Sequence, residues 1–240
     1  MRFKALKNFC VTVGLTTLAT TVVLGQAAQG RQEAPPTLDQ LKAAVAKLEV
    51  GRVKRPTSYD ALTAEQKAYV NGILTGPRAA ISGPLSVMMV SPGMGSIVQQ
   101  AMAYSRFAGT EGFSSVPPKL NELGILMVAR HWTADYVWNA HNRYAVQVGL
   151  SPDVVEAIKQ GTRPAKMDKD VQVIYDFVDE MLTKRKVSDA SFQAARGVLG
   201  SDKGVVDLVG TLGLYQISSM LVVVDALVPA NATSRLPALK

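Results

Sequence analysis

Both histidines of the chain, His131 and His141, fall in one short stretch that also holds both tryptophans. Glu122 precedes them on a segment that is otherwise mostly apolar, where a carboxylate is costly to bury without a partner. If the two segments are helices that pack antiparallel, Glu122 faces His141. A carboxylate that orients an imidazole is a standard acid–base unit. The same spacing also fits a purely structural pair, in which Glu122 ties two helices together through His141 or Arg130.

Three arginines, Arg78, Arg106 and Arg130, are suited to hold a substrate carboxylate through paired hydrogen bonds, and of these we favour Arg130. The two histidines are not spaced to ligate a metal from one helix face. The sequence also contains no glycine-rich dinucleotide or phosphate loop and no Gly-x-Ser-x-Gly elbow. It therefore predicts a site with no metal and no cofactor.

The single cysteine, Cys10, lies in the apolar run Phe9–Gly25, which follows three basic residues at the N-terminus. This pattern is typical of a secretory signal peptide, and we assign residues 1–28 to it, with cleavage near Ala27. An uncleaved anchor is the alternative, but the run is short of the about 20 residues that a spanning helix needs. The sequence thus predicts a secreted or periplasmic protein whose mature chain has no disulfide and no thiolate nucleophile.

The net charge of the chain is +7, and removing the three basic residues of the leader leaves about +4. The mature chain is therefore mildly basic. It has no dense cluster of Lys and Arg with interleaved aromatic residues, which argues against nucleic acid as a partner. A small anionic substrate is compatible with this charge.

Helical periodicity recurs along the chain, and alternation typical of strands is scarce, so we predict an all-α protein. Residues 29–58 are expected to form a flexible N-terminus and a short helix, residues 59–228 a helical domain, and residues 229–240 a tail. The apolar run Leu212–Val228 is interrupted by polar residues and reads as a buried core helix, so no stable membrane span is expected once the leader is removed. The predicted helices span residues 38–48, 63–74, 94–107, 118–130, 133–149, 152–161, 168–184, 188–199 and 202–227.

The run Asn121–Arg130, followed by Tyr136-x-Trp138-x-x-His141 and then Ala145-x-x-x-Gly149-Leu150-Ser151, resembles the core of carboxymuconolactone decarboxylase-like proteins. The resemblance covers roughly residues 60 to 225. It implies an AhpD-like helical bundle that assembles into a homotrimer or hexamer, with active sites near the subunit contacts. The apolar C-terminal helix is a suitable interface element in such an assembly.

The resemblance also implies a cofactor-free lyase, isomerase or hydrolase that acts on a small carboxylated or lactone-type compound. His141 would then move a proton and Glu122 would orient it, as the catalytic pair. Arg130, Tyr136 and Trp138 would bind the substrate, with Arg130 and Tyr136 holding its carboxylate or oxyanion.

Two positions depart from patterns of the related families. Alkylhydroperoxidases of this fold carry a Cys-x-x-Cys before the histidine, and here these positions are Ala134 and Val137. A peroxidase or peroxiredoxin-type activity is therefore disfavoured, because the thiolate performs that chemistry. Many decarboxylase-like members also have a glutamate where Val137 stands. A non-catalytic exported binding protein consequently remains a third interpretation.

Overall fold

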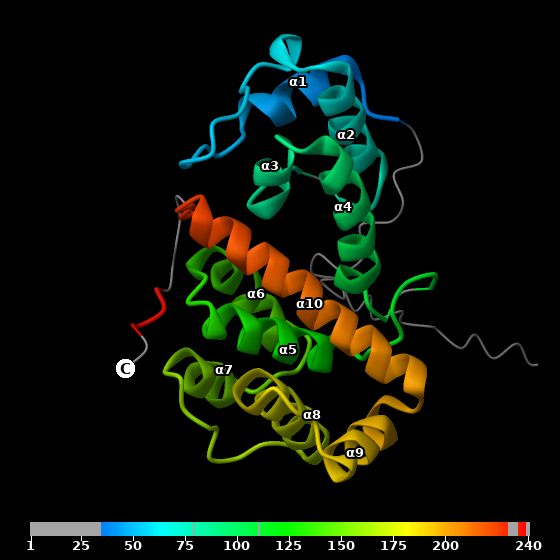
Figure 1. Ribbon diagram of the computed structural model, residues 1–240, viewed down its shortest axis with the longest axis vertical. Helices are drawn as coiled ribbons and strands as arrows, with labels where there is room; N and C mark the ends of the chain where they lie inside the picture. The colour runs from blue at the N-terminus through cyan, green and yellow to red at the C-terminus, as the bar shows by residue number, and fades with distance from the viewer. Residues whose placement is uncertain (1–34, 79, 110, 230–234, 239–240) are drawn as a thin grey trace, which may run out of the picture.

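The computed structural model describes residues 35–78, 80–109, 111–229 and 235–238. The expected signal peptide, residues 1–28, and much of the expected tail lie outside these residues. Within the described part of the chain, all regular secondary structure is helical (Figure 1), which confirms the predicted all-α class. The α-helices are α1 Leu38–Ala46, α2 Ala64–Thr75, α3 Pro84–Met88, α4 Pro92–Arg106, α5 Pro118–His131, α6 Asp135–Gln147, α7 Pro152–Lys159, α8 Lys169–Asp179, α9 Asp189–Leu199 and α10 Asp202–Val224.

Several helix starts follow from local sequence. Thr63 and Gln66 form the expected capping box at the start of α2, each side chain bonding the other's backbone N–H. Proline occupies the first position of α5 and of α7, where its missing N–H costs nothing. Each of these starts coincides with a predicted boundary to within a residue, because the signal is contained in the terminal turn itself.

Three local expectations were wrong. The loop-rich stretch before residue 93 contains the short helix α3. Thr133 does not cap α6: its φ is 48° and Ala134 stands at the N-cap without a side-chain hydrogen bond. The helix predicted for residues 168–184 ends at Asp179 and continues as a π-helical turn, Glu180–Lys184.

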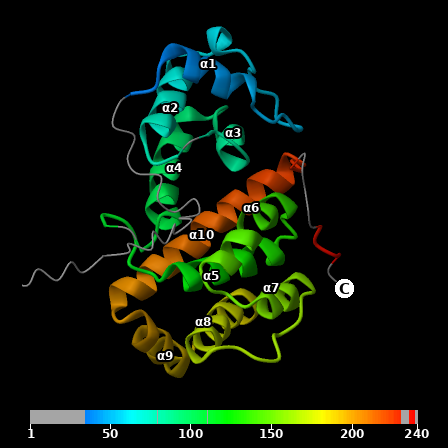
Figure 2. The same cartoon turned by 180° about the vertical axis from the view of Figure 1, so that it is seen from behind.

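Two hydrophobic cores lie on opposite sides of α10, which crosses the molecule diagonally (Figures 1 and 2). The smaller core is formed by α1–α4 and the larger one by α5–α10. One face of α10 supplies Leu208 and Leu212 to the larger core, while Leu214 and Leu221 pack against the smaller one. Because α1 contributes Leu41 and Val45 to the smaller core, residues before position 59 are part of the packed structure.

The centre of the larger core is α5, in which residues 120–130 are all buried. Helix α10 approaches α5 closely at Gly124, where a Cβ atom would lie 2.9 Å from Cδ2 of Leu212. Such a close approach leaves no room for water between the two helices. Glu122, two residues earlier on the same helix, is also buried and points to a different face, toward Arg106 and His141.

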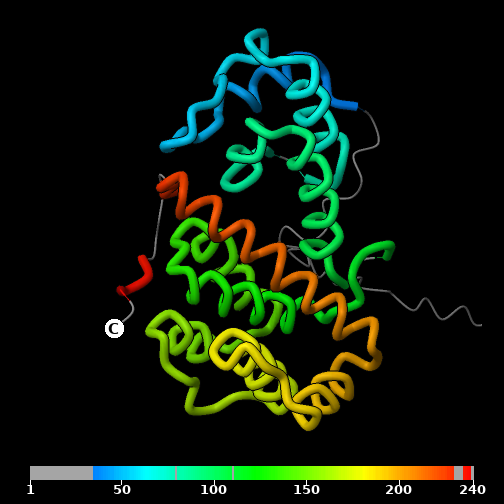
Figure 3. The backbone as a smooth tube through the Cα atoms, in the orientation of Figure 1, coloured from blue at the N-terminus to red at the C-terminus, as the bar shows by residue number. Residues whose placement is uncertain are grey.

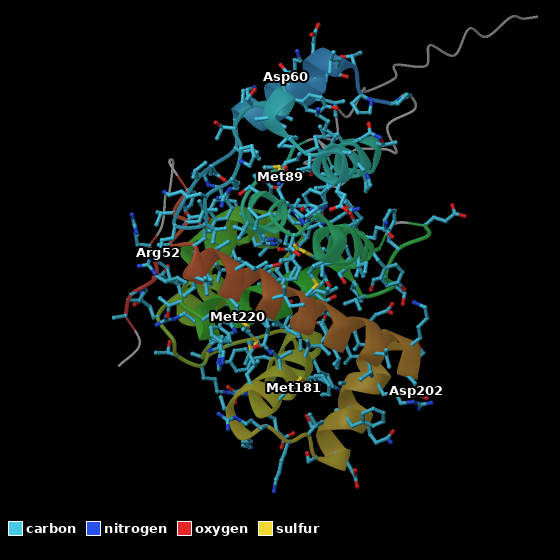
Figure 4. The ribbon with its side chains drawn as sticks, turned by 45° about the horizontal axis from the view of Figure 1, so that its top comes forward. Arg52, Asp60, Met89, Met181, Asp202 and Met220 are labelled. Carbon is cyan, nitrogen blue, oxygen red and sulfur yellow. The ribbon has the colours of Figure 1, made fainter. Side chains whose placement is uncertain are left out.

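A loop that follows α1 returns to the C-terminal end of α10 (Figure 3). The backbone N–H of Arg52 donates to the carbonyl oxygen of Asp225 at 2.8 Å, and Arg52 lies beside that end of α10 in Figure 4. The guanidinium of Arg55 pairs with the Asp225 carboxylate at 2.8 Å, and both side chains are fully buried. This contact fixes the N-terminal segment to the last turn of α10.

The outward face of α10 is exposed and apolar. Val206, Ile217, Met220 and Val224 are each more than a third exposed, and Met220 is labelled on this helix in Figure 4. Within the described residues, α10 alone has the length and apolar composition of a membrane span. Less than half of its most apolar stretch is buried, so the expected buried core helix is buried on one side only.

Candidate functional site

Glu122 on α5 and His141 on α6 meet in the interior between the two helices. Nδ1 of His141 lies 2.7 Å from Oε2 of Glu122, and their side chains are 7% and 1% exposed. A three-residue turn joins α5 to α6, so the two helices pack side by side and the facing of these residues follows from the helical repeat. The juxtaposition predicted from the sequence is present in the structure.

Arg106, at the end of α4, completes the cluster from the other side. Its Nη1 donates to Oε1 of Glu122 at 3.0 Å, so each carboxylate oxygen of Glu122 has its own partner. The guanidinium also lies over the ring of Tyr144, 4.8 Å from its centroid. Arg106 therefore supplies the positive charge that a buried carboxylate requires.

The surroundings of His141 keep its imidazole neutral. Burial lowers the pKa of His141, and the nearby positive charges of Arg106 and Arg78 lower it further, against the opposing effect of Glu122. A carboxylate paired with Arg106 accepts hydrogen bonds only, so Nδ1 carries the proton and donates it to Glu122. The other ring nitrogen, Nε2, then has a free lone pair, which is the form that a general base needs.

His141 lines a cavity of about 640 Å³, a volume typical of small-molecule sites. The charged side chains among its described lining residues are three arginines, Arg78, Arg106 and Arg143, and none of the described lining residues is acidic. Glu122 is not part of the wall and lies behind His141 and Arg106. The cavity therefore presents an imidazole and positive charge to a bound molecule, while the carboxylate holds both in place.

Arg78 follows α2 and brings a second guanidinium to this cavity. Its Nε and Nη2 are buried and have no hydrogen-bond partner among the described residues. Burial lowers the pKa of Arg78, and repulsion from Arg106 acts in the same direction. Buried donors that lack an acceptor are rare and costly, so this side chain is suited to an acceptor that arrives with a ligand.

Tyr136 forms another part of the cavity wall and is held there by residues of the other half of the molecule. Its hydroxyl donates to Oε2 of Glu49 at 2.6 Å, and the same oxygen accepts the backbone N–H of Gly83 at 3.2 Å. Gly83 has a φ of +55°, and a Cβ there would lie 2.4 Å from the Tyr136 ring. Only glycine permits this approach.

This arrangement was compared with known proteins. No protein-family model and no curated protein sequence matches the chain. A solved structure of an uncharacterized peroxidase-related protein from Silicibacter sp. TM1040 is similar to it, with a TM-score of 0.60 and 16% sequence identity. The match covers 79% of this chain and 97% of the other. The chain has the AhpD-like fold.

Not every predicted site residue of this AhpD-like chain lies at the cavity. His141 and Tyr136 line it, and Glu122 lies directly behind. Trp138 is 1% exposed and belongs to the larger hydrophobic core, because its position on α6 turns it away from the cavity. Arg130 lines a separate small cavity and bonds Thr133, so the structure does not bring it to His141.

The structure places Arg78 and Arg106 at the cavity of His141, whereas Arg130, the arginine favoured from the sequence, lines a different cavity. Arg106 and Arg78 were considered as carboxylate ligands, but Arg130 was favoured, on the same helix as Glu122. The residues that reach the cavity come from α4 and from the segment after α2, far away in the sequence. No local pattern marks them, because only the packing of α4 against α10 brings Arg106 to Glu122.

Tyr215 of α10 also lines the cavity, and no motif pointed to it. Its ring stands edge-on to the imidazole of His141, with 4.9 Å between the ring centroids and 89° between the planes. Burial raises the pKa of Tyr215 to about 12, so its hydroxyl stays protonated at neutral pH. The Tyr215 ring packs against the imidazole and so limits its rotation.

Proposed function

We propose that this protein is an acid–base enzyme that acts, without a cofactor, on a small carboxylated compound. The reaction would be of the kind performed by a carboxymuconolactone decarboxylase-like lyase, isomerase or hydrolase. One observation carries the proposal: a neutral imidazole, oriented by a buried carboxylate, lines a cavity whose charged wall residues are arginines. A buried acid–base pair with a perturbed pKa beside a cavity is the usual signature of a catalytic site.

His141 acts on the substrate through Nε2. The lone pair of Nε2 accepts a proton from a carbon next to a carbonyl group, and the electron pair of the broken C–H bond moves onto the carbonyl oxygen as an enolate. The imidazolium that forms is stabilised by the Glu122 carboxylate at Nδ1. In an isomerisation, Nε2 then returns the proton to another carbon of the enolate. In a decarboxylation, no C–H bond breaks first: the electron pair of the C–CO2 bond moves onto the carbonyl oxygen as carbon dioxide leaves, and Nε2 delivers to the enolate carbon a proton that it has taken up from solvent.

Arg106 and Arg78 hold the anionic parts of the substrate. Arg106 donates one N–H group to Glu122, and its side chain is 19% exposed toward the cavity. Arg78 has two buried donors that lack an acceptor. Fixed donors in a site with little water stabilise developing negative charge more strongly than water does. The same two guanidiniums therefore suit both a substrate carboxylate and an enolate oxygen.

Two other functions are less well supported. A dithiol peroxidase needs two cysteines, and the chain has only Cys10. The corresponding positions are Ala134, buried at the start of α6, and Val137, which lines the cavity near His141. A binding protein without activity would need the cavity and its arginines, but it would have no use for a base with a free lone pair. The peroxidase-related name of the structural neighbour adds no support, since it describes that protein only.

The test compares His141→Ala with His131→Ala on a panel of γ-lactone acids and other small carboxylated compounds. His131 is a matched control because it is the other histidine and lies outside the cavity. Loss of a general base is expected to lower kcat by about 100-fold to 10,000-fold for any compound that the wild-type protein converts. The H131A variant should retain wild-type turnover.

Unchanged turnover in H141A would remove His141 from the reaction. Binding of the same compounds by wild-type protein without conversion of any of them would favour the binding protein instead. Thiol-dependent peroxide reduction by the purified protein would overturn the acid–base assignment, because none of the described residues that line this cavity is a cysteine.

A further inference from the structure

A second cavity has a volume of about 130 Å³ and is separate from the cavity of His141. It is enclosed by the end of α5, the end of α7, helix α8 and the π-helical turn that follows α8. The two cavities share no lining residue. Arg130 contributes to the wall of this second cavity, together with Thr162, Tyr175 and Thr183. The guanidinium of Arg130 is therefore buried at a place that the proposed reaction does not use.

Arg130 is only 5% exposed and has little compensation for its charge. Its Nη1 donates to Oγ1 of Thr133 at 3.3 Å, and its Nε is buried with no partner among the described residues. No described carboxylate lies within ion-pair distance of it, whereas Arg55 and Arg106 both have one. Because arginine does not lose its proton in proteins, the charge remains and the protein bears the full cost of burying it.

The one acidic residue in this wall does not neutralise Arg130. Asp179 is part of the lining, where its charge acts on Tyr175 and on Arg163, but it makes no ion pair with Arg130. Burial alone lowers the pKa of Arg130, with no contribution from a nearby charge. The guanidinium is thus isolated from the carboxylates around it.

Two unusual backbone features are associated with Arg130 and its cavity: one is the residue that bonds Arg130, and the other is part of the wall. Thr133, the only side-chain partner of Arg130 among the described residues, has a φ of 48°, a region that β-branched residues rarely occupy. The π-helical turn Glu180–Lys184 supplies Leu182 and Thr183 to the wall. Strained residues and π-turns persist where the surrounding structure requires them, and they concentrate at binding sites.

We propose that this second cavity is a binding site for a small oxyanion, a carboxylate or a phosphate, with Arg130 as its principal ligand. An oxyanion supplies the missing negative charge and accepts from the guanidinium in the paired geometry that arginine favours. The volume suits it: a water molecule occupies about 30 Å³ in the liquid, so the space holds one such ion and little more. Thr162 and Thr183 also line the cavity, but their hydroxyls donate to the carbonyl oxygens of Ala157 and Asp179, so the ion would depend on Arg130 for its hydrogen bonds.

The experiment observes the Nε–H groups of arginine in the proton–nitrogen NMR spectrum of the full chain while inorganic phosphate is added at constant pH and ionic strength. The signal of Arg130, assigned by its loss in Arg130→Lys, should move downfield and reach a plateau. Phosphate should also raise the thermal midpoint of the wild-type protein by more than that of Arg130→Met, which keeps the larger cavity. A parallel titration with acetate separates phosphate from carboxylate as the preferred ligand.

The Nε–H signal of Arg78 is the internal comparison for that of Arg130. Phosphate that binds in the larger cavity should move the signal of Arg78 and leave that of Arg130 in place. An Arg130 signal that stays in place, or equal stabilisation of wild type and R130M, would overturn the proposal and leave the cavity to ordered water. The assay does not involve His141, so its outcome is independent of the proposed reaction.

Discussion

Two buried clusters in this protein join an arginine to a carboxylate, and they differ in what surrounds them. Arg55 and Asp225 connect the loop after α1 to the end of α10, and both side chains are sealed from solvent. The remaining donors of Arg55 bond the carbonyl oxygens of Glu49 and Val53, and the second oxygen of Asp225 accepts the N–H of Val53. Each guanidinium nitrogen of Arg55 and each carboxylate oxygen of Asp225 therefore has a hydrogen-bond partner within the protein.

Arg106 and Glu122 form the second cluster, which is satisfied on one side only. Glu122 is enclosed and bonds both Arg106 and His141, but Arg106 and His141 also line the cavity. Arg78 stands beside them with donors that lack a partner. The same residue types thus stabilise the fold in one place and leave binding capacity in the other. The difference is that backbone carbonyl oxygens accept the remaining hydrogen bonds of Arg55, whereas Arg106 faces an open cavity.

The largest expected effect on stability is at the sealed cluster. Asp225→Asn keeps the shape of the side chain but leaves the Arg55 charge buried without compensation. We expect the free energy of unfolding to fall by about 3–5 kcal/mol, as measured by urea denaturation. The control is Asp60→Asn, which removes an exposed ion pair with Lys42 and should cost no more than about 1 kcal/mol. Equal costs for the two variants would contradict the distinction between sealed and open clusters.

A smaller loss of stability is expected at the open cluster. Glu122→Gln removes the charge between Arg106 and His141 but retains the side-chain volume. Because water in the cavity still reaches Arg106, we expect a cost of about 1–3 kcal/mol, below that of D225N. The variant should also lower the pKa of His141, since Glu122 is the group that raises it.

The pH dependence of kcat/KM measures the effect of E122Q on the pKa of His141. The free imidazole is the active form, so kcat/KM rises with pH through the pKa of His141 and then levels. In the variant this acidic limb should move to lower pH while the plateau falls. A limb that does not move would show that Glu122 has no electrostatic effect on His141, whatever its effect on stability.

The smallest effect is the contribution of His141 to the pH dependence of folding. Its pKa is lowered in the folded protein, so the folded state binds fewer protons than the unfolded state. This contribution to stability is complete above the unfolded value of 6.5 and is lost as the pH falls toward the folded pKa. His141→Gln should therefore lose less stability than the wild-type protein between pH 7 and pH 5, as measured by urea denaturation at each pH. Identical slopes for H141Q and wild type would show that His141 is not buried in its neutral form.

The part of the site that depends on residues close together in the sequence could be predicted. Glu122 and His141 lie on consecutive helices joined by a short turn, so the period of the helix and the cost of an isolated buried carboxylate were enough to pair them. Tyr136, five residues before His141 on the same helix, was expected from the family resemblance and not from helical spacing. Trp138 is on the same helix, but the sequence did not show that its side chain points into the hydrophobic core.

The sequence alone determined the all-helical fold, most helix starts and the pairing of Glu122 with His141, because these depend on interactions within a turn or between adjacent helices. The tertiary structure decided which arginines surround that pair. Arg78 and Arg106 reach it from the other side of α10, and Arg130, which is nearer in the sequence, faces a different cavity. Contacts between distant segments depend on how whole helices pack, and no local pattern of residues encodes that packing.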